Sequence, residues 1–249
     1  MKRLRESSFD QKQKEYFEMV AYDQFNWLTN NPQIALLEQE LLSELLISKP
    51  EKILELGCAE GADLVNLRKF GIKCKFYGLD YSKTRISFAK KNAPFAEYIN
   101  ADAYDIPFKS SSFDVVFCKN LLHHLSNYQQ VVNEMIRVCR PGGRIVLIEP
   151  NGKNPIFFLF SCLVSSERGL IKFTSGNIVR LIKENPSLRS IKVLMKEPDN
   201  LLRLILHYRW GSPGLSNHLW FWPKIRLIAY RLLPKQYYGY MFIEATKGI

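Results

Sequence analysis

A strand, a tight turn and the start of a helix follow one another closely near the beginning of this chain. An apolar run over residues 52–56 leads into a turn that holds Gly57, Ala59 and Gly61, and a helical pattern begins almost at once. Small residues in such a turn allow the backbone to approach a neighbouring group closely. Asp80 closes a second apolar run, so its carboxylate is expected beside the tip of the first strand. Because a carboxylate can accept hydrogen bonds from both hydroxyl groups of a ribose, the unit predicts a nucleoside site.

Strand and helix patterns alternate along much of the chain. Residues 11–48 have apolar side chains at helical spacing, and a helix is also expected over residues 175–184. Strands are expected over residues 52–56, 74–79, 96–100, 113–118, 143–149, 188–196 and 238–247, with helices between the first five. This alternation predicts an α/β fold, with a parallel sheet covered by helices on both faces.

Acidic residues surround the turn. Glu55 stands two residues before Gly57, and Glu60 and Asp63 lie in the turn and the first helical turn. These carboxylates would repel a pyrophosphate. The turn therefore favours a cofactor that has no phosphate groups and that carries a positive charge.

Several segments resemble one enzyme family. Residues 55–61, Glu-Leu-Gly-Cys-Ala-Glu-Gly, resemble motif I of the class I S-adenosylmethionine-dependent methyltransferases. Further segments resemble the family's later motifs in the expected order, in the form found in the ubiquinone-biosynthesis group: residues 98–103, 108–117, 121–125 and 140–150. The resemblance covers roughly residues 50–150. It implies S-adenosyl-L-methionine as cofactor and a Rossmann-like sheet of seven strands, mostly parallel, whose last strand is antiparallel and lies between the fifth and sixth.

The resemblance also implies a set of cofactor contacts, with Asp102 near the adenine amino group. The set is Glu55, Gly57, Cys58, Ala59, Gly61, Asp80, Tyr81, Asp102, Ala103, Lys119 and Asn120. Ala59 stands where the family more often has glycine, and its methyl group disfavours positive φ and narrows the space over the cofactor. Cys58 has no basic neighbour in sequence, so we interpret it as a small filler and not as a nucleophile.

Two histidines supply the candidate for catalysis. His123 and His124 follow the expected fourth strand, and the leucines around them leave few ways to orient both imidazoles outward. We select His124 as the base, while a role in lining the pocket or binding backbone stays open. His207 is a weaker alternative. Tyr22 and Trp27, with Tyr16, would either close over the cofactor or pack in the core. No spacing of histidines and cysteines suggests a metal, so none is expected.

The chain divides into two expected parts with an uneven charge. Residues 1–48 would cover the cofactor cleft, and residues 49–249 would form the methyltransferase domain, with cap insertions near 153–174 and 199–236. Residues 1–150 hold 20 Lys and Arg against 19 Asp and Glu, whereas residues 151–249 hold 15 against 5. The positive excess therefore belongs to the C-terminal part.

The second insertion contains three of the four tryptophans, with arginines among large apolar residues. One interpretation is a pair of cap helices packed on the core. The other is a lid over an apolar or lipid-linked acceptor, or a surface that lies on a membrane. A loose resemblance to methyltransferases of lipid-like acceptors favours the second interpretation. Nucleic acid is disfavoured as a partner, because the aromatic residues stand in amphipathic runs and no RNA-binding module is visible.

The remaining expectations concern the compartment and the class of function. The five cysteines show no disulfide or metal pattern, the first residues lack the apolar core of a secretory signal, and no run of eighteen apolar residues occurs. We therefore expect a cytoplasmic protein, with the inner face of the membrane as a possible location. The main function expected is methyl transfer to a small acceptor. A non-catalytic cofactor-binding subunit and an RNA methyltransferase are the alternatives, and the sequence gives no signal for the oligomeric state.

Overall fold

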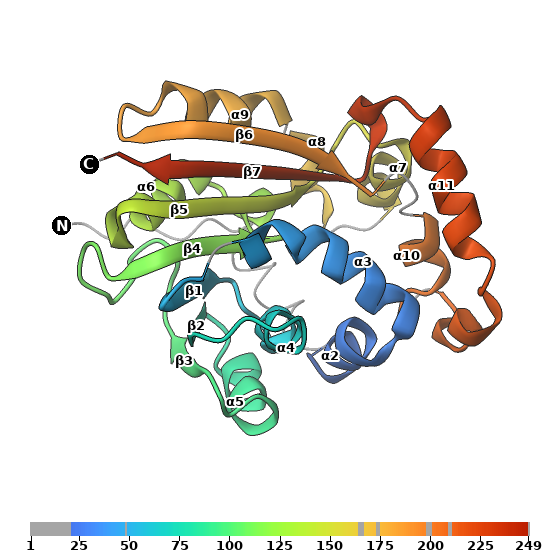
Figure 1. Ribbon diagram of the computed structural model, residues 1–249, viewed down its shortest axis with the longest axis horizontal. Coiled ribbons are helices and arrows are strands. Elements are labelled where there is room, and N and C mark those ends of the chain that lie inside the picture. The colour runs from blue at the N-terminus through green and yellow to red at the C-terminus, as the bar shows by residue number, and fades with distance from the viewer. Residues whose placement is uncertain are drawn as a thin grey trace.

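The computed structural model describes residues 21–47, 49–163, 167–172, 175–197, 201–208 and 211–248. Within these residues, seven strands form one sheet in the order β3-β2-β1-β4-β5-β7-β6 (Figure 1). The strands are β1 (Lys52–Leu56), β2 (Lys75–Asp80), β3 (Glu97–Asn100), β4 (Phe113–Lys119), β5 (Cys139–Pro150), β6 (Leu188–Lys196) and β7 (Tyr240–Lys247). Strand β7 is antiparallel to β5 and β6, and the other pairs are parallel. The expected α/β fold and the place of its last strand are confirmed.

Helices cover both faces of the sheet. One face packs against α3 (Pro32–Leu42), the 3-10 helix η1 (Ser43–Ile47), α4 (Ala62–Lys69) and α5 (Lys83–Asn92). The other face packs against α6 (Tyr128–Val138) and α9 (Ser175–Glu184). Phe117 of β4 and Phe242 of β7 are fully buried in the first of these two cores. The sheet is therefore the middle layer of a three-layer domain.

A third core joins the N-terminal helices to the second insertion. Helix α2 (Ala21–Asn30) and α3 meet α10 (Leu201–Ile205), η4 (Pro213–His218) and α11 (Trp222–Leu232) beyond the carboxyl ends of the parallel strands (Figure 1). Leu28, Ile34 and Leu37 pack with Leu202 and Trp222 in this core. Segments far apart in the sequence thus form one helical cap.

Some boundaries differ from the predictions. Strand β5 begins at Cys139 and not at residue 143, because Phe113 already pairs with Cys139 before the register shifts and Val115 pairs with Arg144. The expected turn at residues 140–143 is thus absorbed into an irregular start of the strand. The last strand begins at Tyr240, two residues later than expected. Residues 11–20 of the expected N-terminal helices, and Tyr16 with them, lie outside the described residues.

The insertion helices leave much of their apolar surface uncovered. In α11, Ile228 is 55% exposed and Leu232 is 75% exposed, whereas Trp222 is buried. Helix α7 (Pro155–Leu163) likewise exposes apolar side chains, at Phe158, Leu159 and Leu163. Trp222 thus packs on the core as the first interpretation expects, whereas most of the apolar face of α11 does not. Of the helices described here, none has both the length and the apolar character needed to cross a bilayer.

Candidate functional site

A cavity of about 280 Å³ lies between the carboxyl ends of β1, β2 and β4 and the helical cap. In the sheet, β2 and β3 lie on one side of β1, and the later strands lie on the other side. After β3 the chain therefore returns across the sheet, and the strand order reverses between the neighbours β1 and β4. Ligands of open α/β sheets bind at such a switch point. The cavity lining comes both from the strand ends and from the cap, so the cap encloses the site.

The two glycines of the turn have different roles. Gly57 lines the cavity at φ +67°, and a Cβ there would lie 2.9 Å from Leu121 Cδ1. Gly61, at φ +79°, packs against Tyr98 instead and does not line the cavity. Both positions need a residue without a Cβ. Gly61 is the only residue of the expected cofactor set that the cavity lining lacks.

Asp80 and Ala59 hold the turn in place. Asp80 is buried and accepts a hydrogen bond from the Ala59 N–H at 2.9 Å and another from the Ser82 N–H at 2.9 Å. Ala59 has φ +47°, in the left-handed region that we expected its methyl group to disfavour. Ala59 adopts this conformation in spite of its methyl group, and the hydrogen bond to the Asp80 carboxylate stabilises it.

The other members of the expected set come together around the same cavity. Its lining includes Glu55, Cys58, Tyr81, Asp102, Ala103, Lys119 and Asn120. Asp102 is exposed and accepts a hydrogen bond from the Tyr104 N–H at 3.0 Å. Burial raises the pKa of the Cys58 thiol well above its ordinary value, which makes this thiol a poor nucleophile. Whether these residues contact a cofactor stays a prediction.

Glu55 places a buried carboxyl group at the floor of the cavity. Burial, together with the nearby Asp63 carboxylate, raises the pKa of Glu55 well above its ordinary range. Its Oε2 atom has no hydrogen-bond partner in the described structure. A buried acceptor atom of this kind is costly unless a ligand supplies a donor. The floor of the cavity therefore suits a group with N–H donors, such as an ammonium group.

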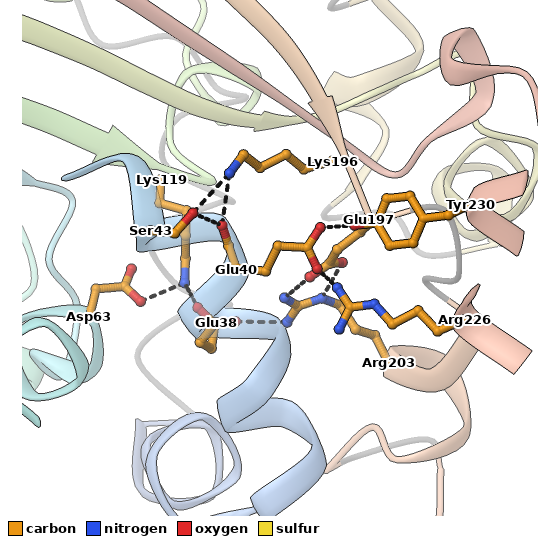
Figure 2. Close-up of polar contacts among 10 residues, drawn as sticks. All are labelled: Glu38, Glu40, Ser43, Asp63, Lys119, Lys196, Glu197, Arg203, Arg226 and Tyr230. Atoms are coloured by element: carbon orange, nitrogen blue, oxygen red, sulfur yellow. Dashed lines mark hydrogen bonds and ion pairs between the residues drawn. The ribbon is translucent and has the colours of Figure 1, made fainter. Parts of the chain in front are cut away.

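Lys119, at the end of β4, neutralises part of this negative charge. Its Nζ donates to Asp63 Oδ1 at 2.5 Å and to Glu38 of α3 (Figure 2). Burial opposes the charge of Lys119, but Asp63 and Glu38 outweigh it and raise the pKa of the amine. Arg203 of α10 donates to Glu38 Oε1 at 2.8 Å and also pairs with Glu197. A buried chain of charges thus links the sheet, α3 and the cap.

A second group of contacts binds α11 to α3. Glu40 forms an ion pair with Arg226 and accepts a hydrogen bond from the Tyr230 hydroxyl, both on α11 (Figure 2). Lys196 of β6 donates to the Glu40 carbonyl and to Ser43 Oγ, each at 3.0 Å. Polar contacts therefore hold α11 against the body, while its apolar side chains stay exposed.

His123 lies in the wall of the cavity, between two carboxylates. Its Nδ1 lies 2.7 Å from Glu149 Oε2, and its Nε2 lies 3.5 Å from Glu167 Oε2. Glu149 also accepts hydrogen bonds from the Leu121 and Leu122 N–H groups. Burial alone would lower the pKa of His123, but the two carboxylates raise it to about 9.

The selected base, His124, lies beside His123, with ring centroids 3.8 Å apart and the ring planes inclined at 44°. Both histidines are buried and both line the cavity. The argument that the surrounding leucines would allow only one imidazole to face the cleft is therefore wrong. It failed because the short 3-10 helix η2 (Leu122–His124) directs both rings to the same side.

Comparison with known proteins agrees with this geometry. A family model described as "Methyltransferase domain" matches residues 54–147. This part of the chain is therefore similar to a methyltransferase domain. The matched residues include the end of β1 from Leu54, its turn, Asp80 and both histidines.

The relatives that match this part of the chain are named for different substrates. The chain is 28% identical over 151 residues to demethylmenaquinone methyltransferase of Oceanobacillus iheyensis, covering 57% of this chain and 63% of that enzyme. It is 31% identical over 113 residues to norajmaline N-methyltransferase of Rauvolfia serpentina, covering 43% and 38%. The matched part thus spans less than two thirds of these relatives' own length.

Solved structures share the fold over nearly the whole chain. Phosphoethanolamine N-methyltransferase 2 of Haemonchus contortus, in complex with S-adenosyl-L-methionine, superposes with a TM-score of 0.71 at 18% identity, covering 98% of this chain and 60% of that one. The [4+2]-cyclase SpnF superposes with a TM-score of 0.63 at 14% identity, covering 98% of both chains. At these identities the likeness concerns the fold alone.

Aromatic side chains from the cap complete the cavity. The His207 ring stacks on Tyr208 with centroids 4.5 Å apart, and Trp27 of α2 lies 5.4 Å from His207. Phe160 of α7 lies 6.1 Å from His207. Tyr22 is instead exposed and does not line the cavity. The end of the cavity near the histidines is therefore largely aromatic and apolar.

The sequence prediction missed four acidic residues of this site: Glu38, Asp63 as a partner of Lys119, Glu149 and Glu167. Two of them carried a usable signal. Glu149 ends an apolar strand in the way that Asp80 does, and Glu38 stands on the apolar face of a helix, four residues after Ile34. Glu167 follows an apolar helix and has no such pattern.

Proposed function

We propose that this chain transfers a methyl group from S-adenosyl-L-methionine to a small apolar acceptor. The observation that carries the proposal is the acidic cavity at the β1–β4 switch point, where Glu55, Asp80 and Asp102 converge without a phosphate-binding glycine fingerprint. When bound, the cofactor supplies a methyl group that its sulfonium already activates. What remains for the protein is to bind, to orient and to exclude water.

The carboxylates suit distinct parts of this cofactor. Asp80 would accept hydrogen bonds from the ribose hydroxyls, because its carboxylate lies at the end of β2 beside the turn and lines the cavity. Asp102, at the cavity rim, would accept from the adenine amino group. The buried Glu55 carboxyl would accept from the α-ammonium group of the methionine part.

The acceptor is proposed to be lipophilic and quinone-like. The aromatic lining formed by Trp27, Phe160, His207 and Tyr208 suits a planar ring, and one group of relatives is named for methylating demethylmenaquinone. His124 lies at this end of the cavity, and we propose that it activates the acceptor. A neutral imidazole would do so by accepting a proton from a hydroxyl group.

A membrane surface is the proposed source of the acceptor. Helices α7 and α11 lie at the same end of the molecule (Figure 1), and both have exposed apolar side chains. The C-terminal part of the chain also carries the positive excess, which would attract anionic head groups. An apolar acceptor would then pass from the bilayer into the aromatic end of the cavity without crossing water.

The test is transfer of a labelled methyl group from the cofactor to a panel of reduced quinones and short-tailed analogues. We expect label in the organic phase for a ring with a free hydroxyl or ring position, and a loss of at least about 100-fold in rate for His124→Asn. If the protein binds the cofactor but no acceptor of the panel becomes labelled, a non-catalytic or cyclase-like use of the fold is favoured. SpnF shows that such a use exists among proteins of this shape.

A further inference from the structure

Three potential ligand atoms converge on the acceptor-side wall of the cavity. His123 and His124 come from η2, after β4, and Glu167 comes from the first cap insertion. One ligand atom from each of the three residues lies within 4.8 Å of the other two. Two imidazoles and one carboxylate form a donor set that divalent transition-metal ions prefer.

The two distances around His123 differ in kind. Its Nδ1 lies 2.7 Å from Glu149 Oε2, which is an ordinary hydrogen-bond length. Its Nε2 lies 3.5 Å from Glu167 Oε2, which is long for a hydrogen bond. Two ligands that each lie about 2.1 Å from one tetrahedral ion are separated by about 3.4 Å. The second distance therefore matches a pair of metal ligands.

Glu149 supplies what a metal-binding histidine needs behind it. Its Oε2 accepts from Nδ1 of His123, so it holds the ring with Nε2 directed toward Glu167 and the cavity, where an ion would displace the Nε2 proton. Its Oε1 accepts from the N–H groups of Leu121 and Leu122, at 3.0 and 2.8 Å, so the carboxylate itself is immobilised. Carboxylate, imidazole and ion in this order are the usual arrangement around protein-bound zinc.

We propose that His123, His124 and Glu167 bind a divalent transition-metal ion, such as Zn²⁺, on the acceptor side of the cavity. Three protein ligands leave a fourth position, which is typical of catalytic and not of structural zinc sites. Because the three residues line the cavity, this position is accessible to the acceptor. The inference rests on the proposed function only in assigning that position to an acceptor oxygen.

The ion would change how His124 acts. In the metal-free protein His124 is a base, whereas in the metal-loaded protein it is a ligand and the ion lowers the pKa of the bound hydroxyl group. The acceptor would then lose its proton to water before its oxygen or ring carbon attacks the methyl group. Glu167 would also connect the first insertion to the wall of the cavity.

The experiment is a titration of the chelator-treated full chain with Co²⁺ and with Zn²⁺, by visible absorption and by calorimetry. We expect one ion per chain. We also expect intense visible absorption from the bound Co²⁺, as is typical of a Co²⁺ ion with a low coordination number. Glu149→Gln should weaken binding by about 10- to 100-fold, and Glu167→Gln and His124→Asn should weaken it at least as much. His218→Asn is the matched control, because His218 is exposed on η4 and lies outside the cavity lining.

The outcomes separate this inference from the proposed function. Binding of S-adenosylhomocysteine, measured without added metal, reports on the cofactor site and shows that each variant is folded. Cofactor binding with no ion bound at submillimolar concentration would overturn the metal site alone. Equal loss of ion affinity in His218→Asn and His124→Asn would overturn it as well. If the chain binds the ion but not the cofactor, the metal site is supported and the proposed function is contradicted.

Discussion

Residues of the same type perform different tasks within the turn after β1. Gly57 gives room to the cavity, whereas Gly61 gives room to the Tyr98 ring. Ala59 shows that the left-handed conformation itself does not require glycine here, because the Asp80 carboxylate stabilises it. What requires glycine at position 61 is therefore the contact with Tyr98 as well as the backbone angle.

Gly61→Ala should destabilise the fold by about 2–4 kcal/mol, since a Cβ would lie 2.3 Å from Tyr98 Oη at φ +79°. Gly71→Ala is the matched control: Gly71 has φ +99°, and nothing lies within 4 Å of its Cβ position. That variant carries only the backbone cost, about 1–2 kcal/mol. Urea unfolding measures both. Equal losses in the two variants would contradict a packing role for Gly61.

At the scale of elements, charges bind the cap to the sheet. Glu38 of α3 lies between Lys119 of β4 and Arg203 of α10 (Figure 2). Burial opposes the ionised form of Glu38, but the two cations outweigh burial and lower the pKa of Glu38 to about 2. The folded protein therefore binds the proton of Glu38 more weakly than the unfolded chain does.

The sign of the resulting pH dependence follows directly. Glu38 stabilises the fold above its unfolded pKa of about 4.5, and this contribution is lost as the pH falls toward about 2. We expect the wild type to lose about 1–3 kcal/mol more stability between about pH 5 and pH 3 than Glu38→Gln does. Glu51→Gln, at an exposed position, should behave like the wild type. Parallel profiles for the wild type and Glu38→Gln would refute the assignment.

The two tryptophans near the start of α11 test how the cap is held. Trp222 is 6% exposed and packs with α2, α3 and α10, whereas Trp220 is 75% exposed. Trp222→Ala should cost about 3–5 kcal/mol, or unfold the cap locally, while Trp220→Ala should stay within about 0.5 kcal/mol of the wild type. Thermal unfolding and tryptophan emission report both effects. A larger loss of stability in Trp220→Ala than in Trp222→Ala would contradict the role of Trp222 in the third core.

The elements that could be predicted are those with a strong periodic pattern. Helix α9 and strand β6 begin and end where the sequence predicts, because one is strongly amphipathic and the other is bounded by Pro186 and Pro198. The orientation of α11 could not be predicted, since an amphipathic pattern identifies an apolar face and not what that face meets. The contacts of Arg226 and Tyr230 with Glu40, together with the burial of Trp222, decide it.

Part of the candidate site could also be predicted from the sequence, and part of it could not. Asp80 and the turn could be located because neighbouring strand ends meet at one edge of a sheet. The Glu38–Lys119 pair joins residues 81 positions apart, and the Glu38–Arg203 pair joins residues 165 positions apart. Separations of this size leave no local pattern, so the sequence could not reveal these partners. Glu167 and His123 meet across the first insertion for the same reason.

At the scale of the whole molecule, the exposed faces of α7 and α11 predict binding to membranes. Ile228→Glu/Leu232→Glu should abolish co-sedimentation with anionic vesicles, and added salt should weaken binding of the wild type. Trp222 is buried, so it is not part of this surface. Val193→Glu, on β6, is the control for an added charge at a partly exposed apolar position. If the wild-type protein binds neither anionic nor neutral vesicles, the membrane proposal is contradicted and a water-soluble acceptor is favoured.

The central claim is that the cavity binds S-adenosyl-L-methionine, and calorimetric titration of the full chain tests it most directly. We expect S-adenosyl-L-methionine and S-adenosylhomocysteine to bind at one site and to compete, while NADH does not bind. Asp80→Asn should weaken both ligands by about 10- to 150-fold, the cost of about 1.5–3 kcal/mol for a charge-assisted hydrogen bond. Binding of NADH in place of the sulfonium cofactor, or unchanged affinity in folded Asp80→Asn protein, would contradict the account.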